Sequence, residues 1–116
     1  MATALNAPPV NIRSVTLSAS GSTDPDSYSV PSGRWAMIYI VRIVFGGSGS
    51  GTRTVSVAGS NIDSSTTART VEMGDEPISR IKGFVLNSSD QVTVSSSGLG
   101  SSSVTAVLRI VEFNNP

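Results

Sequence analysis

Apolar and polar residues along this chain recur with the spacing of β-strands, and no segment repeats apolar residues at the helical spacing over three turns. Runs rich in β-branched residues are separated at short intervals by clusters of Gly, Ser, Asn, Asp and Pro, which favour turns. This pattern predicts an all-β fold, an antiparallel β-sandwich of jelly-roll type with about eight strands. The predicted strands are Val10–Ala19, Ser27–Val30, Arg34–Phe45, Thr52–Ala58, Thr66–Met73, Ile78–Leu86, Gln91–Ser96 and Val104–Phe113.

The chain divides into an N-terminal extended arm, residues 1–9, and a single β-sandwich domain, residues 10–116. Pro8 and Pro9 favour an extended path and offer no backbone donors, so we expect the arm to lie on a partner surface. With 116 residues, 38% of them apolar, the chain can form one modest core.

The longest predicted strand, Arg34–Phe45, is apolar on both of its faces. One face would carry Trp35, Met37, Tyr39, Val41, Ile43 and Phe45, and the other Ala36, Ile38, Ile40, Arg42 and Val44. A sandwich strand with one wet face should alternate apolar with polar residues, so the second face needs a cover. Another subunit is the favoured cover, which makes Ile38, Ile40 and Arg42 candidate interface residues. The alternative is a strand that bends between the sheets and buries different faces at its two ends.

The composition argues against catalysis and against most ligands. The chain has no Cys and no His, so it lacks a thiolate nucleophile, the commonest general base, and the Cys and His ligands of metal sites. Eight basic residues balance eight acidic ones, which removes the general drive towards nucleic acid. The longest apolar stretch is too short for a membrane helix, which needs about 20 residues. We therefore expect no enzyme activity, no cofactor, no metal, no nucleic acid and no membrane contact.

Two acidic pairs and one glycine-rich segment could carry chemistry. Asp24-Pro25-Asp26 and Asp75-Glu76 are typical of turns, and nothing marks a cleft for glycoside hydrolysis. The segment Gly46–Gly51 lacks the Lys-Ser/Thr ending and the following helix of a P-loop. We interpret it as a flexible hairpin loop.

Several short motifs resemble small tailed-phage virion proteins of β-sandwich type. Tyr28–Ile38, with the sequence YSVPSGRWAMI, is similar to the "Y-x-V-P-x-G-K/R" opening of that group, which leads into a long hydrophobic strand. Thr52–Val57, Asp90–Ser95 and the final pair Glu112-Phe113 follow in the same order as in the group. The Asp75-Glu76-Pro77 segment, followed by Ser79–Lys82, departs from the shorter turn of many relatives.

The resemblance implies a structural role on a phage particle and carries over no catalytic residue. The favoured function is a capsid decoration, or cement, protein that binds and stabilises the shell of the major capsid protein. The alternative is a tail, neck or head fibre component, or a receptor-binding module that recognises host surface carbohydrate. We expect a homo-oligomer made in the host cytoplasm and located on the virion. A trimer is favoured by the resemblance and by the threefold sites of capsids, and residue spacing does not distinguish it from a dimer.

Overall fold

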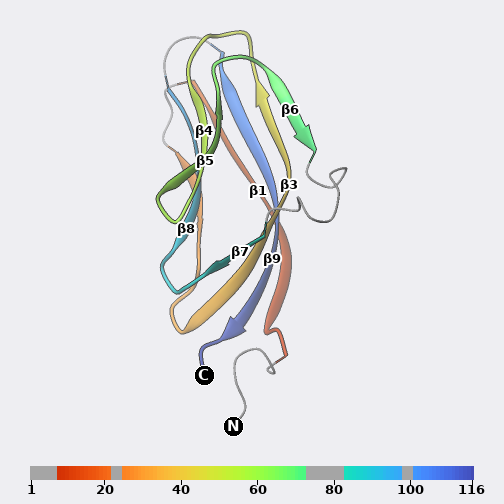
Figure 1. The fold of residues 1–116 in the computed structure, drawn as a ribbon, viewed down its shortest axis with the longest axis vertical. Coiled ribbons are helices and arrows are strands. Elements are labelled where there is room, and N and C mark those ends of the chain that lie inside the picture. The colour runs from red at the N-terminus through yellow and green to blue at the C-terminus, as the bar shows by residue number, and fades with distance from the viewer. Residues whose placement is uncertain (1–7, 22–24, 73–82, 98–100) are drawn as a thin grey trace.

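The protein is an all-β sandwich. The computed structural model describes residues 8–21, 25–72, 83–97 and 101–116, and in these ranges it has nine strands and no helix (Figure 1). The fold class expected from the sequence, two packed antiparallel sheets, is confirmed. The strands are β1 (Asn11–Ser20), β2 (Asp26–Ser29), β3 (Arg34–Gly46), β4 (Arg53–Val57), β5 (Ser60–Ser65), β6 (Arg69–Glu72), β7 (Gly83–Leu86), β8 (Gln91–Ser96) and β9 (Ser103–Asn114).

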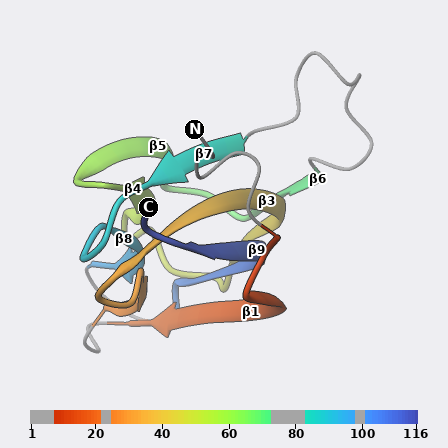
Figure 2. The same ribbon diagram turned by 90° about the horizontal axis from the view of Figure 1, so that it is seen from below.

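The strands form a five-stranded sheet and a four-stranded sheet, which Figure 2 shows as two separate layers. The larger sheet has the order β1-β9-β3-β6, with β7 also paired to β3, and the smaller has the order β2-β8-β4-β5. β6 pairs with residues 42–45 of β3 and β7 with residues 36–39, so these two strands lie end to end along one edge of β3. The expected strand Ile78–Leu86 is described only from Gly83 onward.

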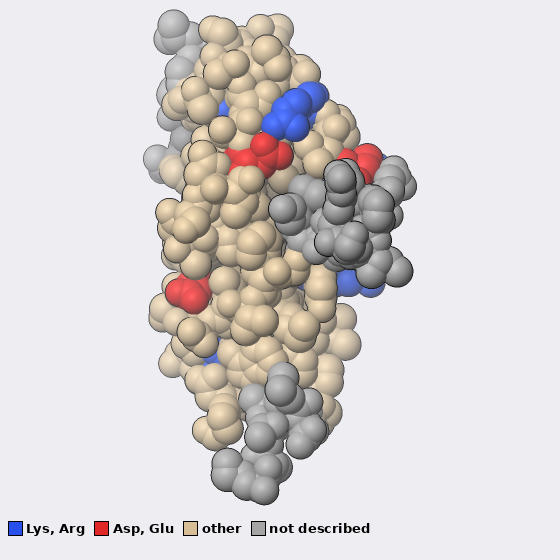
Figure 3. Space-filling view, viewed as in Figure 1, with Lys and Arg blue, Asp and Glu red and all other residues tan. Residues whose placement is uncertain are grey.

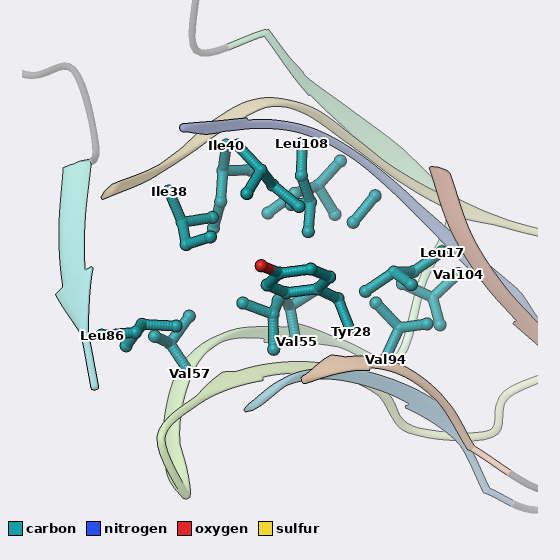
Figure 4. Packing of buried hydrophobic residues seen from close by; sticks show 14 of the residues in the cluster. Leu17, Tyr28, Ile38, Ile40, Val55, Val57, Leu86, Val94, Val104 and Leu108 are labelled. Atoms are coloured by element: carbon teal, nitrogen blue, oxygen red, sulfur yellow. The ribbon is translucent and has the colours of Figure 1, made fainter. Parts of the chain in front are cut away.

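The hydrophobic core lies between the two sheets and consists of the inward-facing residues of their strands. Figure 4 shows Tyr28 at its centre, between side chains of the larger sheet such as Ile38, Ile40 and Leu108 and those of the smaller sheet such as Val55 and Val94. β9 supplies four fully buried apolar residues in strict alternation, which anchor both its neighbours in the sheet. They are Val104, Ala106, Leu108 and Ile110.

A β-bulge at Val41 changes which face of β3 points into the core. The register with β9 shifts between Ile40 and Arg42, because two residues of β3 oppose one of β9 there. Before the bulge Ala36, Ile38 and Ile40 point into the core, and after it Ile43 and Phe45 do.

The prediction that Ile38 and Ile40 lie at a subunit interface is therefore wrong. They are 0% and 1% exposed in the single chain, so no surface remains for a neighbouring subunit. Their cover is the smaller sheet of the same molecule (Figure 4). The residues of β3 that do face outward before the bulge are those of the opposite set, Trp35, Met37 and Tyr39.

The β3–β4 loop wraps around the side chain of Arg53, which is 0% exposed. Its guanidinium donates five hydrogen bonds to backbone carbonyls, at 2.7–3.3 Å. The acceptors are the carbonyl oxygens of Gly46, Gly47, Gly49 and Gly51. Glycine is needed at Gly47 and Gly51, because a Cβ there would lie 1.6 Å and 1.8 Å from the carbonyl oxygens of Ser101 and Ser97. The loop and the Ser101–Ser102 segment thus close this end of the sandwich.

Candidate protein interface

The outer side of the five-stranded sheet carries an apolar row that crosses four strands. Ile12 of β1 lies opposite Val111 of β9, Val111 opposite Met37 of β3, and Met37 opposite Val85 of β7. The two ends of the row are the most accessible, with Ile12 64% and Val85 67% exposed. The four side chains form a continuous apolar strip that is exposed at its ends and half-buried at Met37 and Val111, and soluble monomers seldom leave such a strip open without a function.

Further apolar and aromatic residues extend this strip in both directions. Trp35 and Phe113 are opposite each other in the register and stack with ring centroids 4.3 Å apart. The indole N–H of Trp35 is buried and has no acceptor among the described residues. We call the whole set the apolar face: Ile12, Trp35, Met37, Tyr39, Val41, Val85, Val107, Val111 and Phe113.

The outer side of the four-stranded sheet has the opposite character. Its central row runs Ser27, Thr93, Ser56 and Asn61 across β2, β8, β4 and β5, and the next row is Ser95, Thr54 and Ser64. Every one of these side chains is a hydroxyl or an amide that water can solvate. The outer side of this sheet is therefore polar. On the other sheet the apolar face is bordered by the polar β1 residues Ser14, Thr16 and Ser18, and only the apolar face resembles a surface that needs a partner.

Few charges interrupt the apolar face. Arg109 of β9 lies opposite Tyr39 and forms no ion pair with any described residue. At the far side of the sheet Arg42 pairs with Glu72 at 2.7 Å. Figure 3 looks, as Figure 1 does, at the edge of the sandwich where β5 and β6 lie rather than onto the apolar face, and charged side chains are few on this edge as well.

A buried polar cluster lies beneath the apolar face, at the end of the sandwich near the C-terminus. Glu112 projects inward from β9, is 0% exposed, and accepts hydrogen bonds from side chains of three other strands. The donors are the Tyr28 hydroxyl, Asn11 Nδ2 (3.2 Å), Arg34 Nη1 (2.9 Å) and Arg13 Nη2 (3.4 Å). Arg34 reaches it from the predicted turn, where its N–H donates to the Pro31 carbonyl oxygen.

The cluster perturbs the ionisation of two of its members. Burial alone would raise the pKa of Glu112, but hydrogen bonds from Tyr28, Asn11 and Arg34 and the charge of Arg13 outweigh it and hold that pKa below its ordinary value. Burial, reinforced by the Glu112 carboxylate, raises the pKa of Tyr28 to about 12. The stable state of the cluster is thus an ionised Glu112 beside a protonated Tyr28.

Changing Glu112 to Gln should destabilise the fold by about 1–3 kcal/mol at neutral pH, because charge-assisted bonds to two arginines are lost. The folded-state pKa of Glu112 is lowered, so its contribution is present above the unfolded pKa of about 4.3 and is lost as the pH falls through the folded value. Urea unfolding at stepwise lower pH should show the two proteins converging in stability. A difference in stability between the two proteins that stays constant down to strong acid would contradict a stabilising role for the ionised Glu112.

The remaining predicted site residues lie on the surface. Arg42 is exposed, and Pro8 and Pro9 are exposed at the start of the described chain. The rest of the predicted arm, residues 1–7, lies outside the described residues. Ile12, Val85 and Arg109 are not among the interface residues predicted from the sequence.

The candidate chemical motifs take structural roles where they are described. Asp26 accepts hydrogen bonds from the backbone N–H groups of Ser18 and Ser27, which is turn chemistry between β1 and β2. Asp24, Asp75 and Glu76 lie outside the described residues. Among the described residues no group of three or more acidic, His or Cys side chains could hold a metal ion. The described part of the chain also contains no helix long and apolar enough to cross a membrane.

Comparison with known proteins gives no family. No protein-family model matches the sequence, and no curated protein matches it. Among solved structures, the core of Drosophila NLP, studied for pentamer formation and histone binding, aligns with a TM-score of 0.47 and 17% identity over 85% of this chain and 96% of that chain. Dimeric latent PorU from Porphyromonas gingivalis aligns with a TM-score of 0.31 and 15% identity over 92% of this chain and 10% of that one. Likeness at this level carries no argument about function.

Proposed function

We propose that this protein is a non-enzymatic structural component of a phage particle, a capsid decoration protein that binds the shell through its apolar face. The observation that carries the proposal is the contrast between the apolar row Ile12–Val111–Met37–Val85 and the hydroxyl-rich outer side of the other sheet. A decoration protein needs one adhesive and one solvated side, because it lies on a shell and faces water. The virion itself is inferred from the resemblance of the sequence motifs.

The proposal includes a jelly-roll topology. In an eight-stranded jelly roll one sheet contains the first, eighth, third and sixth strands and the other the second, seventh, fourth and fifth. If β6 and β7 are counted as two halves of one interrupted strand, the orders β1-β9-β3-β6 and β2-β8-β4-β5 fit this arrangement. Many virus capsid proteins use this fold, which supports the virion assignment by analogy only.

We further propose that the protein acts as a homo-oligomer, a trimer at the threefold sites of the shell, with the major capsid protein as its main partner. Sedimentation of the purified protein tests the oligomeric state directly. The alternative function, a fibre component or receptor-binding module, would place recognition in exposed loops that combine aromatic and polar residues. Among the described residues the aromatic side chains lie in strands, which favours decoration.

Replacing Ile12 with Asp, or Val85 with Asp, should lower affinity for phage particles assembled without this protein by about 10-fold or more, because each puts a charge into the proposed contact. Both residues are highly exposed, so the fold should lose little stability. The measurement is add-back of purified protein followed by co-sedimentation with particles.

The matched control is Ser29→Asp, which adds the same charge to an exposed edge-strand position on the polar face. There the Asp can still accept the hydrogen bond that Gln91 donates to Ser29. It should bind particles like the original protein. Unchanged binding by both apolar-face variants, together with specific binding to host cells, would favour the fibre alternative instead.

A further inference from the structure

One cation on the outer side of the larger sheet has no partner among the residues that the structure describes. Arg109 is exposed and lies on β9 between Val107 and Val111, with Tyr39 directly opposite on β3. Each of the other arginines described is engaged: Arg13 and Arg34 with Glu112, Arg42 with Glu72, Arg69 with Asp63, and Arg53 with backbone carbonyls. Arg109 alone among them forms no ion pair and no hydrogen bond with a described residue.

The surroundings of Arg109 make it costly to cover with an uncharged surface. Contact through the apolar face would remove water from the guanidinium, and a desolvated charge without a counter-charge opposes binding strongly. A carboxylate is the matching group, because its two oxygens accept two parallel N–H donors from a guanidinium. Arginine and tyrosine flanked by aliphatic residues are also the types that contribute most at protein interfaces.

We propose that the partner presents a carboxylate to Arg109 within an otherwise apolar surface. This rests on the proposed function, in which the apolar face binds the capsid shell, and it states the chemistry of the receiving site. The described residues of a second copy packed face to face do not supply such a group. The acidic residue described on the same side of the sheet is Glu72, and Arg42 already neutralises it at 2.7 Å.

Arg109→Gln should weaken binding to particles assembled without the protein by about 10-fold or more, since one partner of a desolvated ion pair is lost. Raising the salt concentration from about 0.1 M to about 1 M should weaken the original protein more than this variant, because screening acts on the charge pair. Ser29→Asp, which changes the net charge by the same amount on the polar face, should keep the original affinity and salt dependence.

A second variant tests the same pair without touching Arg109. Ser14 of β1 lies directly opposite Arg109, so Ser14→Asp places a carboxylate within its reach and satisfies it inside the chain. We expect Ser14→Asp to weaken particle binding as Arg109→Gln does, while Ser14→Asn, which matches it in size without the charge, keeps the affinity.

The outcomes separate this inference from the proposed function. If Arg109→Gln and Ser14→Asp bind like the original protein while Ile12→Asp does not, the apolar face binds the shell but the carboxylate inference is wrong. If Ile12→Asp and Val85→Asp also bind normally, the proposed function itself is wrong.

Discussion

Replacing Ile40 with Asp is expected to unfold the chain rather than to release a smaller folded species. The Ile40 side chain is 1% exposed and points towards Tyr28 and Leu108 in the centre of the core (Figure 4). An unpaired carboxylate there costs several kcal/mol, a large part of the roughly 5–15 kcal/mol that stabilises a domain. Far-ultraviolet circular dichroism and urea unfolding should show loss of the β-structure or a greatly lowered midpoint.

Val41→Asp is the matched control, because the bulge leaves this neighbouring residue 36% exposed on the outer side of the sheet. It should remain folded with a stability close to that of the original protein. A folded Ile40→Asp protein that sediments as a smaller species would mean that Ile40 lies at a subunit interface and that the burial described above is incorrect.

The β3 strand shows how much of its burial could be predicted from the sequence. Alternation correctly predicted that the strand is apolar on both sides and that one side faces away from its own core. It assigned the wrong side to the exterior, because the bulge at Val41 changes the parity of the residues that follow. The odd-numbered and the even-numbered residues of β3 are both mostly apolar, so no change in the pattern marks the position of the bulge.

Strands that depend on pairing were harder to predict than strands with an apolar face of their own. β8 was predicted with the boundaries that the structure has, since Val92 and Val94 alternate with polar residues. β5 was missed because Ser60–Ser65 contains a single apolar residue, Ile62, and is held as an edge strand by its pairing with β4.

The motifs that resemble phage virion proteins hold the fold together. Tyr28, Arg34 and Glu112, far apart in sequence, meet in the buried cluster, and Trp35 stacks on Phe113 beside it. Such motifs are informative about the sandwich and much less so about its partner. Ile12 and Arg109, which we assign to binding, lie outside them, so the partner has to be argued from the exposed face itself.

The candidate interface could be predicted only in part. The two-sided strand allowed either a covered outer face or a strand that buries different faces at its two ends, and β3 does the latter on the two sides of Val41. The row Ile12–Val111–Met37–Val85 depends on the register of four strands, and the two partners of Met37, Val85 and Val111, lie far from it in the chain. No local pattern encodes that register.

Changing Arg53 to Met is expected to destabilise the protein by about 2–5 kcal/mol, the second largest effect that we predict. The substitution keeps an apolar stem but removes all five donors, which leaves the carbonyls of Gly46, Gly47, Gly49 and Gly51 without their partners at a closed end of the sandwich. The loss in stability stays below the summed contributions of the five hydrogen bonds, because carbonyls in the exposed part of the loop can accept hydrogen bonds from water instead.

Arg53→Lys separates the charge from the geometry of these bonds. Lysine keeps the charge but has three donors on a compact ammonium, and it cannot reach four carbonyls arranged around a planar guanidinium. Urea unfolding should therefore place the Lys variant well below the original protein, and hydrogen exchange should show faster opening of the β3–β4 loop in both variants. Equal stability of the Lys variant and the original protein would show that charge alone closes this end. Equal stability of all three would show that the loop does not depend on Arg53.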